Sequence, residues 1–300
     1  MLIVGIMVFT LVHLTPGDPA AVILGPDASS SEVEALREQM GFNEPLYVQF
    51  VLWFGDVVRG DLGQSYYLGE PVTRALLNRA EPTILLTLYS LTLAIIIGVP
   101  IGIVSAVKQN TFIDRLAMMF AISGVAIPNF VLGIFLIMFF AVMLGWLPSG
   151  RYENILDDPI QHWRHMIMPT IALGFSSAAL LARLVRSSML DTLKEDYVRT
   201  AFAKGVGFKT VVTRHALRNA LIPAVTVIGY SVGTLLGGAV VTETVFSLPG
   251  MGRLVVNSIA RRDYPIIQGA VMAIAVGYVM ANLIVDIIYV YIDPRIRYGD

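Results

Sequence analysis

Five long apolar runs constrain this chain more than any other feature of its sequence. None of them contains Asp, Glu, Lys, Arg or His, and each has at least the roughly 17 residues that a membrane-spanning helix needs. With 56% hydrophobic and 14% charged residues over 300 positions, the chain has too much apolar surface for an ordinary soluble core. We therefore predict an all-α, polytopic membrane protein. The five runs are residues 82–107, 116–150, 166–182, 219–242 and 266–285.

The start of the chain adds a shorter apolar stretch. Residues 1–14 end at Thr15-Pro16-Gly17-Asp18-Pro19 and lack the basic start and small-residue cleavage site of a signal peptide. We expect a first transmembrane helix, N-terminally truncated, with a short interfacial helix as the alternative. The prediction is then six transmembrane helices, with residues 82–300 forming the core transmembrane domain.

Residues 15–81 form the longest segment between predicted spans, and its patterns are helical. Ser31 and Glu34 have the spacing of a capping box, and Gly41 is suited to end that helix. A second amphipathic helix is expected after Pro45. We expect both helices to lie against the membrane or to cap the bundle, and a role in binding substrate is the alternative.

The distribution of basic residues predicts which segments face the cytoplasm. Segments 108–115, 183–218 and 293–300 hold twelve of the 21 Lys and Arg residues, but only six of the 22 Asp and Glu residues. The alternate segments hold the other nine basic residues and fifteen acidic ones. By the positive-inside rule, the three segments that are richer in Lys and Arg are cytoplasmic, and so are both termini. Residues 15–81 are then extracytoplasmic.

Residues 186–220 are the one long polar and basic interruption between the apolar runs. A helical pattern there has acidic residues at its N-terminal end, where the helix dipole favours them, and apolar residues at helical spacing. Gly205 and Gly207 interrupt the pattern, which resumes at Phe208. We predict two short helices joined by a glycine turn, which together form a docking surface. The residues that define the first helix are Glu195, Asp196, Tyr197, Ala201 and Phe202.

The amino-acid sequence of this loop resembles that of a known family. EDYVRTAFAKG, followed by RHALRNALIP, is similar to the EAA loop of ABC importer permeases, in the variant carried by dipeptide, oligopeptide and nickel permeases. Further matches to that subfamily are HLTPGDPA, GFNEPLYVQF, GDLGQS, ETVFSLPGMGRL and IDPRIRYG. They cover nearly the whole chain. Ala201, Gly205 and Leu217 fit the general pattern of the loop, whereas Arg199, Thr200, His215 and Arg218 depart from it.

This resemblance implies a type I ABC importer transmembrane domain, a multi-pass protein of the bacterial inner membrane. It implies half of a translocation path for peptides or related small solutes, formed with a second, similar permease as a heterodimer. Two cytoplasmic ATPases would bind ATP, so that no cofactor belongs to this chain, and an extracytoplasmic solute-binding protein would deliver the solute. The residues expected to contact the ATPase are Glu195, Asp196, Tyr197, Arg199, Thr200, Ala201, Ala203, Lys204 and Gly205, with Ala201 facing its groove.

Small residues and one proline mark candidate packing or gating positions in the spans. Gly229, Gly233 and Gly237 recur at four-residue spacing, which allows close helix approach. Packing within the bundle is the first interpretation, and contact with a partner permease or a sliding gate is the second. Pro128 should kink its helix because proline removes a backbone donor.

Titratable groups inside the spans are few. Asp286, one turn after Asn282, is a possible intramembrane polar site, either structural, paired with a residue such as Arg183, or functional. A proton-coupled secondary transporter is the alternative function, but it would need titratable groups along its path, and this chain offers only Asp286. We predict no catalytic residues and no metal site, since His162 and His165 lack further ligands. The net charge of −1 does not suggest nucleic-acid binding.

Overall fold

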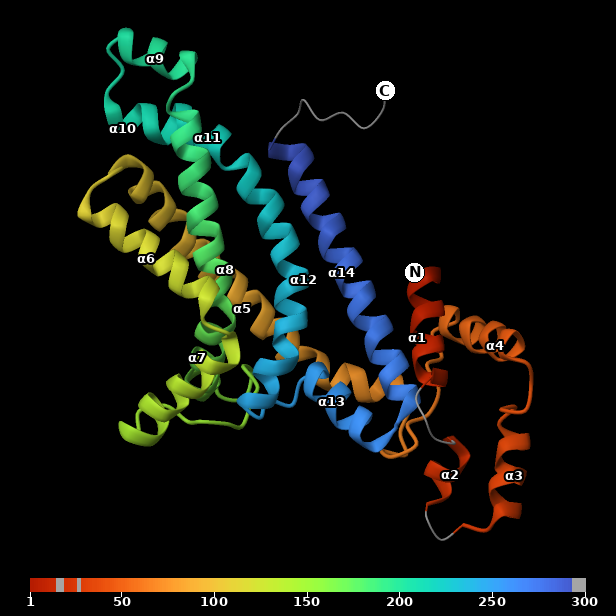
Figure 1. Cartoon of the computed structure of the whole chain (residues 1–300). Coiled ribbons are helices and arrows are strands. Elements are labelled where there is room, and N and C mark those ends of the chain that lie inside the picture. Colours follow the sequence, from red (N-terminus) through yellow and green to blue (C-terminus); the bar gives the residue numbers. More distant parts are fainter. Residues whose placement is uncertain (15–18, 26–27, 293–300) are drawn as a thin grey trace, which may run out of the picture. The chain divides into compact units, whose positions relative to one another are not determined.

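The computed structural model describes residues 1–14, 19–25 and 28–292, and these form helices joined by turns (Figure 1). The β-pairing within the described residues is an isolated bridge between Gln64 and Pro71, so the all-α prediction is confirmed. The chain divides into two compact units. Unit 1 comprises Met1–Thr83 and Pro249–Gly277, and unit 2 comprises Ile84–Leu248 and Tyr278–Asp300, of which residues 293–300 lie outside the described part.

Four helices are long and apolar enough to cross a membrane, and a fifth crossing is present if two bent helices form one span. The first helix, α1 (Leu2–Leu14), has 13 residues and falls short of the length of about 20 that a span needs. The count of six therefore stays a prediction. The four long helices are α5 (Val72–Val107), α8 (Pro159–Thr192), α12 (Ile222–Val245) and α14 (Tyr264–Ile292).

Pro128 breaks its helix outright. Helix α6 (Phe112–Ala126) is followed by the apolar stretch Asn129–Met143, which begins as α7 (Asn129–Leu136) and ends in a π-helical segment. The chain bends by 103° between α6 and this stretch. Ile127, before the proline, is extended, because proline disfavours the helical conformation of its predecessor. The predicted kink is thus a corner between two helices.

In unit 2, α5 and α8 approach closely through glycine. A Cβ atom on Gly98 would lie 2.6 Å from the carbonyl oxygen of Ala178, and one on Gly102 would lie 2.6 Å from that of Ala182. Only glycine fits where one helix touches the backbone of the other. Large apolar side chains, including Leu86, fill the space around α8.

The glycines of α12 do not all contact the same neighbour. A Cβ atom on Gly229 would lie 2.6 Å from Val285, and one on Gly233 would lie 2.3 Å from Tyr278, so both face α14. A Cβ atom on Gly237 would meet no other part of the described structure within 4 Å, apart from the local backbone and chain neighbours in α12. The close contact between α12 and α14 therefore involves the first two glycines.

The N-terminal helices of unit 1 begin close to the predicted positions. The capping box of α3 (Ser30–Gln39) consists of Ser29 and Glu32, not Ser31 and Glu34, because the helix starts two residues earlier than expected. Helix α4 (Leu46–Val58) follows Pro45, as predicted. A short helix, α2 (Pro19–Leu24), precedes both.

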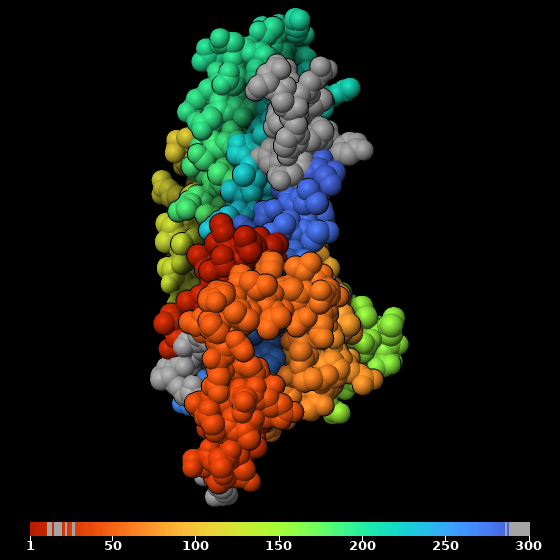
Figure 2. Space-filling model, turned by 90° about the vertical axis from the view of Figure 1, so that its right-hand side faces the viewer, coloured from red at the N-terminus to blue at the C-terminus, as the bar shows by residue number. Residues whose placement is uncertain are grey.

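Helix α4 has one aromatic face against α1 and one apolar face that is exposed among the described residues. Phe50 and Trp53 contact Phe9 of α1, with ring centroids 5.4 and 5.7 Å away. Figure 2 shows this orange N-terminal segment on the face turned toward the viewer. An uncovered apolar face is consistent with the expectation that this helix lies against the membrane. The exposed apolar residues of α4 are Leu46, Tyr47, Val51, Leu52 and Val58.

The rest of unit 1 is built from segments far apart in the sequence. Helix α13 (Met251–Arg261) and the start of α14 lie against the start of α5. Thr83 accepts a hydrogen bond from the backbone N–H of Met251 at 2.9 Å, at the N-terminal end of α13. The sequence prediction placed residues 249–277 with the core domain, whereas here they join the N-terminal segment. The buried residues of this cluster are Val72, Ala75, Leu76, Met251, Leu254, Ile266 and Ala270.

Candidate functional site

The connection between α8 and α12 in unit 2 is itself folded. It contains α9 (Asp196–Ala203) and α10 (Phe208–Thr210), then the π-helical segment Val211–Ala216 and α11 (Leu217–Ala220). Figure 1 shows α9 and α10 beyond the end of α8. The two predicted helices and the intervening turn are present. We refer to residues 193–220 as the connecting loop.

The connecting loop has a small core of its own. Val198 and Val211 are fully buried and Ala201 is 8% exposed, with Leu193 and Val206 packed against them. The structure therefore corrects the expectation that Ala201 faces a groove of a partner, because its own chain covers this side chain. Helical spacing showed that an apolar face exists on α9, but not which neighbour covers it.

A glycine turn reverses the chain between α9 and α10. Gly205 has a φ of 78°, a conformation that residues with a Cβ atom rarely adopt. The N–H of Val206 donates to the carbonyl oxygen of Ala201 at 3.2 Å, which ties the turn to the end of α9. A side chain at position 205 would strain this turn.

Two stacked aromatic rings form the exposed apolar part of the connecting loop. Phe202 is 42% exposed and Phe208 is 53% exposed, with ring centroids 6.2 Å apart and planes at 23°. Exposed aromatic pairs on a folded surface are typical of protein-binding hot spots. Neither Phe202 nor Phe208 was among the residues predicted to contact the ATPase, although an aromatic residue on each side of a glycine turn was a usable signal. Beside the pair, Arg199, Thr200, Ala203 and Lys204 are exposed.

The start of α9 is held by polar contacts. Glu195 occupies the N-cap position without a side-chain cap bond, and Asp196 forms an exposed ion pair with Arg199 at 3.4 Å. The hydroxyl of Tyr197 accepts a hydrogen bond from the side-chain amide of Asn219 at 2.8 Å. Tyr197 therefore joins α9 to α11. The predicted docking residues thus divide into an exposed set and Ala201, which is internal.

A buried ion pair lies in the same unit as the connecting loop, and sequence analysis did not predict it. Arg186 donates to the two carboxylate oxygens of Asp114 at 2.7 and 2.8 Å. Asp114 also accepts from the hydroxyl of Ser105 and from the N–H of Asn110, and its side chain is 6% exposed. The pair joins the end of α5, the start of α6 and the last turns of α8.

The other predicted polar positions have local partners or lie outside the described side chains. Asn282 donates to the carbonyl oxygen of Tyr278 in its own helix at 2.9 Å, and the side chain of Asp286 is not among those described. His162, which sequence analysis considered as a metal ligand, is buried within α8. Its Nδ1 donates to the carbonyl oxygen of Glu153 at 2.8 Å, and its Nε2 lies within hydrogen-bond distance, 3.1 Å, of the hydroxyl of Tyr89.

Long apolar helices in close contact, with a folded and partly apolar loop between two of them, define a polytopic membrane protein. The chain belongs to the family of binding-protein-dependent transport system inner membrane components. Its family model matches residues 98–298, and the model for the N-terminal part of such membrane components matches residues 1–87. It is thus a permease subunit of a binding-protein-dependent ABC importer.

Curated relatives agree with this family, and a solved structure has a similar fold. A probable peptide ABC transporter permease protein, y4tP, of Sinorhizobium fredii is 48% identical over 99% of this chain and 95% of its own length. The glutathione transport system permease protein GsiC of Escherichia coli is 45% identical over the same shares. A structure of the inward-facing MetNI methionine ABC transporter has a TM-score of 0.61 at 18% identity, covering 75% of this chain and 100% of the matched chain. That likeness shows the fold alone.

Proposed function

We propose that this permease forms half of a translocation path for peptides or related small solutes, together with a second, similar permease. The solute class is supported by the two relatives, whose names specify peptide and glutathione transport. Glutathione is itself a small peptide, so both names point to short peptide-like solutes. The coverage of 99% of this chain means that the similarity includes the spans as well as the connecting loop.

The energy for transport would come from two cytoplasmic ATPases that bind the connecting loop. The observation that carries this proposal is the exposed Phe202–Phe208 pair on a loop that has its own core. A loop folded in this way can transmit a push or a pull to α8 and α12, whereas a flexible linker cannot. ATP would be bound by the partner subunits, and a solute-binding protein would deliver the solute on the opposite side of the membrane.

An uptake experiment tests the proposed energy source. The permease would be reconstituted in liposomes with its partner permease, its ATPases and its binding protein, and glutathione uptake would be measured. We expect uptake to require ATP at the ATPase side and to persist when an uncoupler removes the proton gradient. Uptake by the permeases alone, driven by a pH gradient, would contradict the proposal and favour the secondary transporter.

We further propose that the connecting loop and both termini are cytoplasmic, on the basis of the basic residues counted above. The chain has no cysteine, so single cysteines can be introduced without background labelling. An impermeant thiol reagent applied to intact cells should label Gln64→Cys and Asp157→Cys, which are exposed positions. It should label Lys204→Cys only after the membrane is opened. Labelling of Lys204→Cys in intact cells would reverse the topology.

A further inference from the structure

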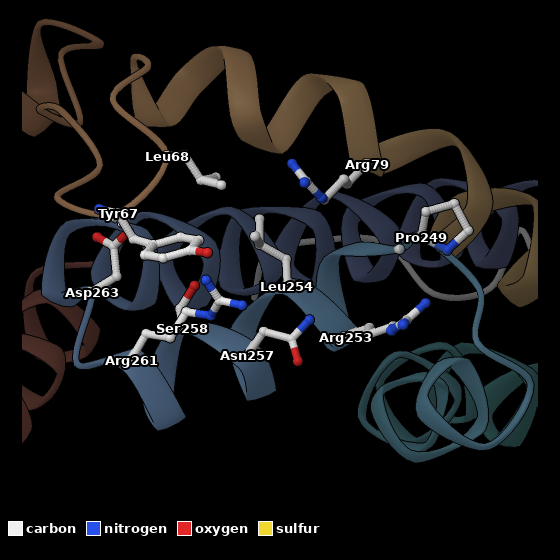
Figure 3. A pocket seen from close by; sticks show the side chains of 11 residues that line it. Tyr67, Leu68, Arg79, Pro249, Arg253, Leu254, Asn257, Ser258, Arg261 and Asp263 are labelled. Atoms are coloured by element: carbon white, nitrogen blue, oxygen red, sulfur yellow. Dashed lines mark hydrogen bonds between the residues drawn. The ribbon is translucent and has the colours of Figure 1, made fainter.

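An arginine-lined pocket of about 240 Å³ lies within unit 1. Figure 3 shows it between α13 on one side and the start of α5, with the preceding loop, on the other. Its walls are partly apolar, from Leu68 and Leu254. Its polar and charged lining residues include Tyr67, Arg79, Arg253, Asn257, Arg261 and Asp263.

Helical spacing explains why basic groups gather here. Arg253, Asn257 and Arg261 follow one another at four-residue intervals, so they lie along one face of α13. Arg79, on α5, lies on the facing wall (Figure 3). The lining therefore holds three guanidinium groups against one carboxylate, that of Asp263.

The one carboxylate of the pocket, that of Asp263, is already hydrogen-bonded to the loop that precedes α5. Asp263 is 2% exposed and accepts hydrogen bonds from the hydroxyl of Ser65 and the N–H groups of Tyr66 and Tyr67. These bonds hold the loop that places the Tyr67 ring 3.6 Å from the guanidinium carbon of Arg261. Burial, and then the nearby Asp263, raise the pKa of Tyr66 to about 12, so this phenol adds no negative charge.

Two of the three arginines have no anionic partner in the described part of the chain. Arg79 donates a hydrogen bond to the carbonyl oxygen of Ala75 at 3.3 Å, and the guanidinium group of Arg261 lies over the ring of Tyr67. No described carboxylate lies within ion-pair distance of either group. Like charges gathered in a recess repel one another, and an incoming anion relieves that repulsion.

We propose that this pocket binds a carboxylate group. The planar guanidinium fork matches the two oxygens of a carboxylate, and the leucine side chains fit the carbon skeleton to which a carboxylate is attached. The volume is below the roughly 300 to 1,000 Å³ of pockets that enclose a whole small ligand, so the pocket accepts an end group. That carboxylate belongs either to the solute or to an acidic side chain of the solute-binding protein. The proposal of a carboxylate site holds whether or not the solute is a peptide.

Saturation-transfer NMR on the assembled complex in nanodiscs tests the proposal with two probes, N-acetyl-L-alanine and its neutral amide. We expect saturation of the acid and not of the amide. In the double variant Arg79→Gln and Arg261→Gln, acid binding should weaken by about tenfold or more, as the loss of charge-assisted hydrogen bonds implies. Equal saturation of acid and amide in the unmodified complex would overturn the proposal.

The matched control is Arg262→Gln, which removes the same charge from an exposed neighbour that does not line the pocket. Acid binding should be unchanged in this variant, and an equal loss there would show that only net charge matters. If the double variant does not assemble, Arg261→Lys keeps the charge without the planar fork and should also weaken acid binding. Unchanged binding in Arg261→Lys would then count against the site.

A docking experiment identifies the source of the carboxylate. Capture of the unloaded solute-binding protein by the complex should weaken in the pocket variants if the carboxylate is a side chain of that protein. Capture should be unchanged if the carboxylate belongs to the solute. Both results are compatible with the site, because the NMR result alone decides whether it exists.

Discussion

Replacing Phe202 with Asp is expected to leave the permease folded and inserted, but unable to hold its ATPases. The Phe202 ring is exposed and stacks on Phe208, and it is not part of the loop's own core. Loss of an aromatic hot spot costs about 2 kcal/mol or more, which is roughly 30-fold in affinity, and the new carboxylate would be desolvated at the contact. Co-purification of the ATPases and solute-stimulated ATP hydrolysis measure the effect.

Two further variants separate docking from folding of the connecting loop. Ala201→Asp should also lose the ATPases, but by placing a carboxylate in the loop's own core beside Val198 and Val211. Limited proteolysis should then cut this loop, whereas the loop of Phe202→Asp should stay resistant.

Lys209→Ala, at an exposed position, should have little effect on ATPase binding, because surface charge pairs are worth about 0 to 1 kcal/mol. Full ATPase binding and hydrolysis in Phe202→Asp would remove the docking assignment.

The second large effect is expected at the buried ion pair. Arg186→Met removes the bidentate partner of Asp114 and leaves a carboxylate whose side chain is 6% exposed. Breaking a fully buried pair typically costs about 3 to 5 kcal/mol, and we expect a cost toward the lower end of that range because the Arg186 side chain is 22% exposed. This is still a large share of the stability of most proteins. We expect the yield of assembled, monodisperse complex to fall sharply, as measured by size-exclusion chromatography with a heating series.

A matched arginine and a double variant test the cause of that loss. Arg183→Met lies one turn earlier on α8 at an exposed position, so its thermal stability should be close to that of the unmodified protein. Adding Asp114→Asn to Arg186→Met should recover part of the stability, because the buried charge is then gone. If Arg186→Met were as stable as Arg183→Met, the pair would not be a structural link between α5, α6 and α8.

Much of the fold could be predicted from local signals in the sequence. Charge-free runs predicted the long helices, Pro45 and Pro128 marked a helix start and a helix break, and Gly205 marked the turn between α9 and α10. Each of these signals acts within a few residues, through lost hydrogen bonds, a fixed φ or a freely accessible positive φ. The position of the connecting loop and its two-helix form followed from them.

Contacts between distant residues were decided by the tertiary structure alone. Asp114 and Arg186 are 72 residues apart, and Ser65 and Asp263 are 198 apart, so no local pattern joins either pair. Periodicity indicated an apolar face on α9, but the fold turned Ala201 inward and left Phe202 exposed. The physical reason is that spacing determines which side chains share a helix face, whereas burial depends on what covers that face. The pocket arginines of α5 and α13 likewise became neighbours only when the two helices met.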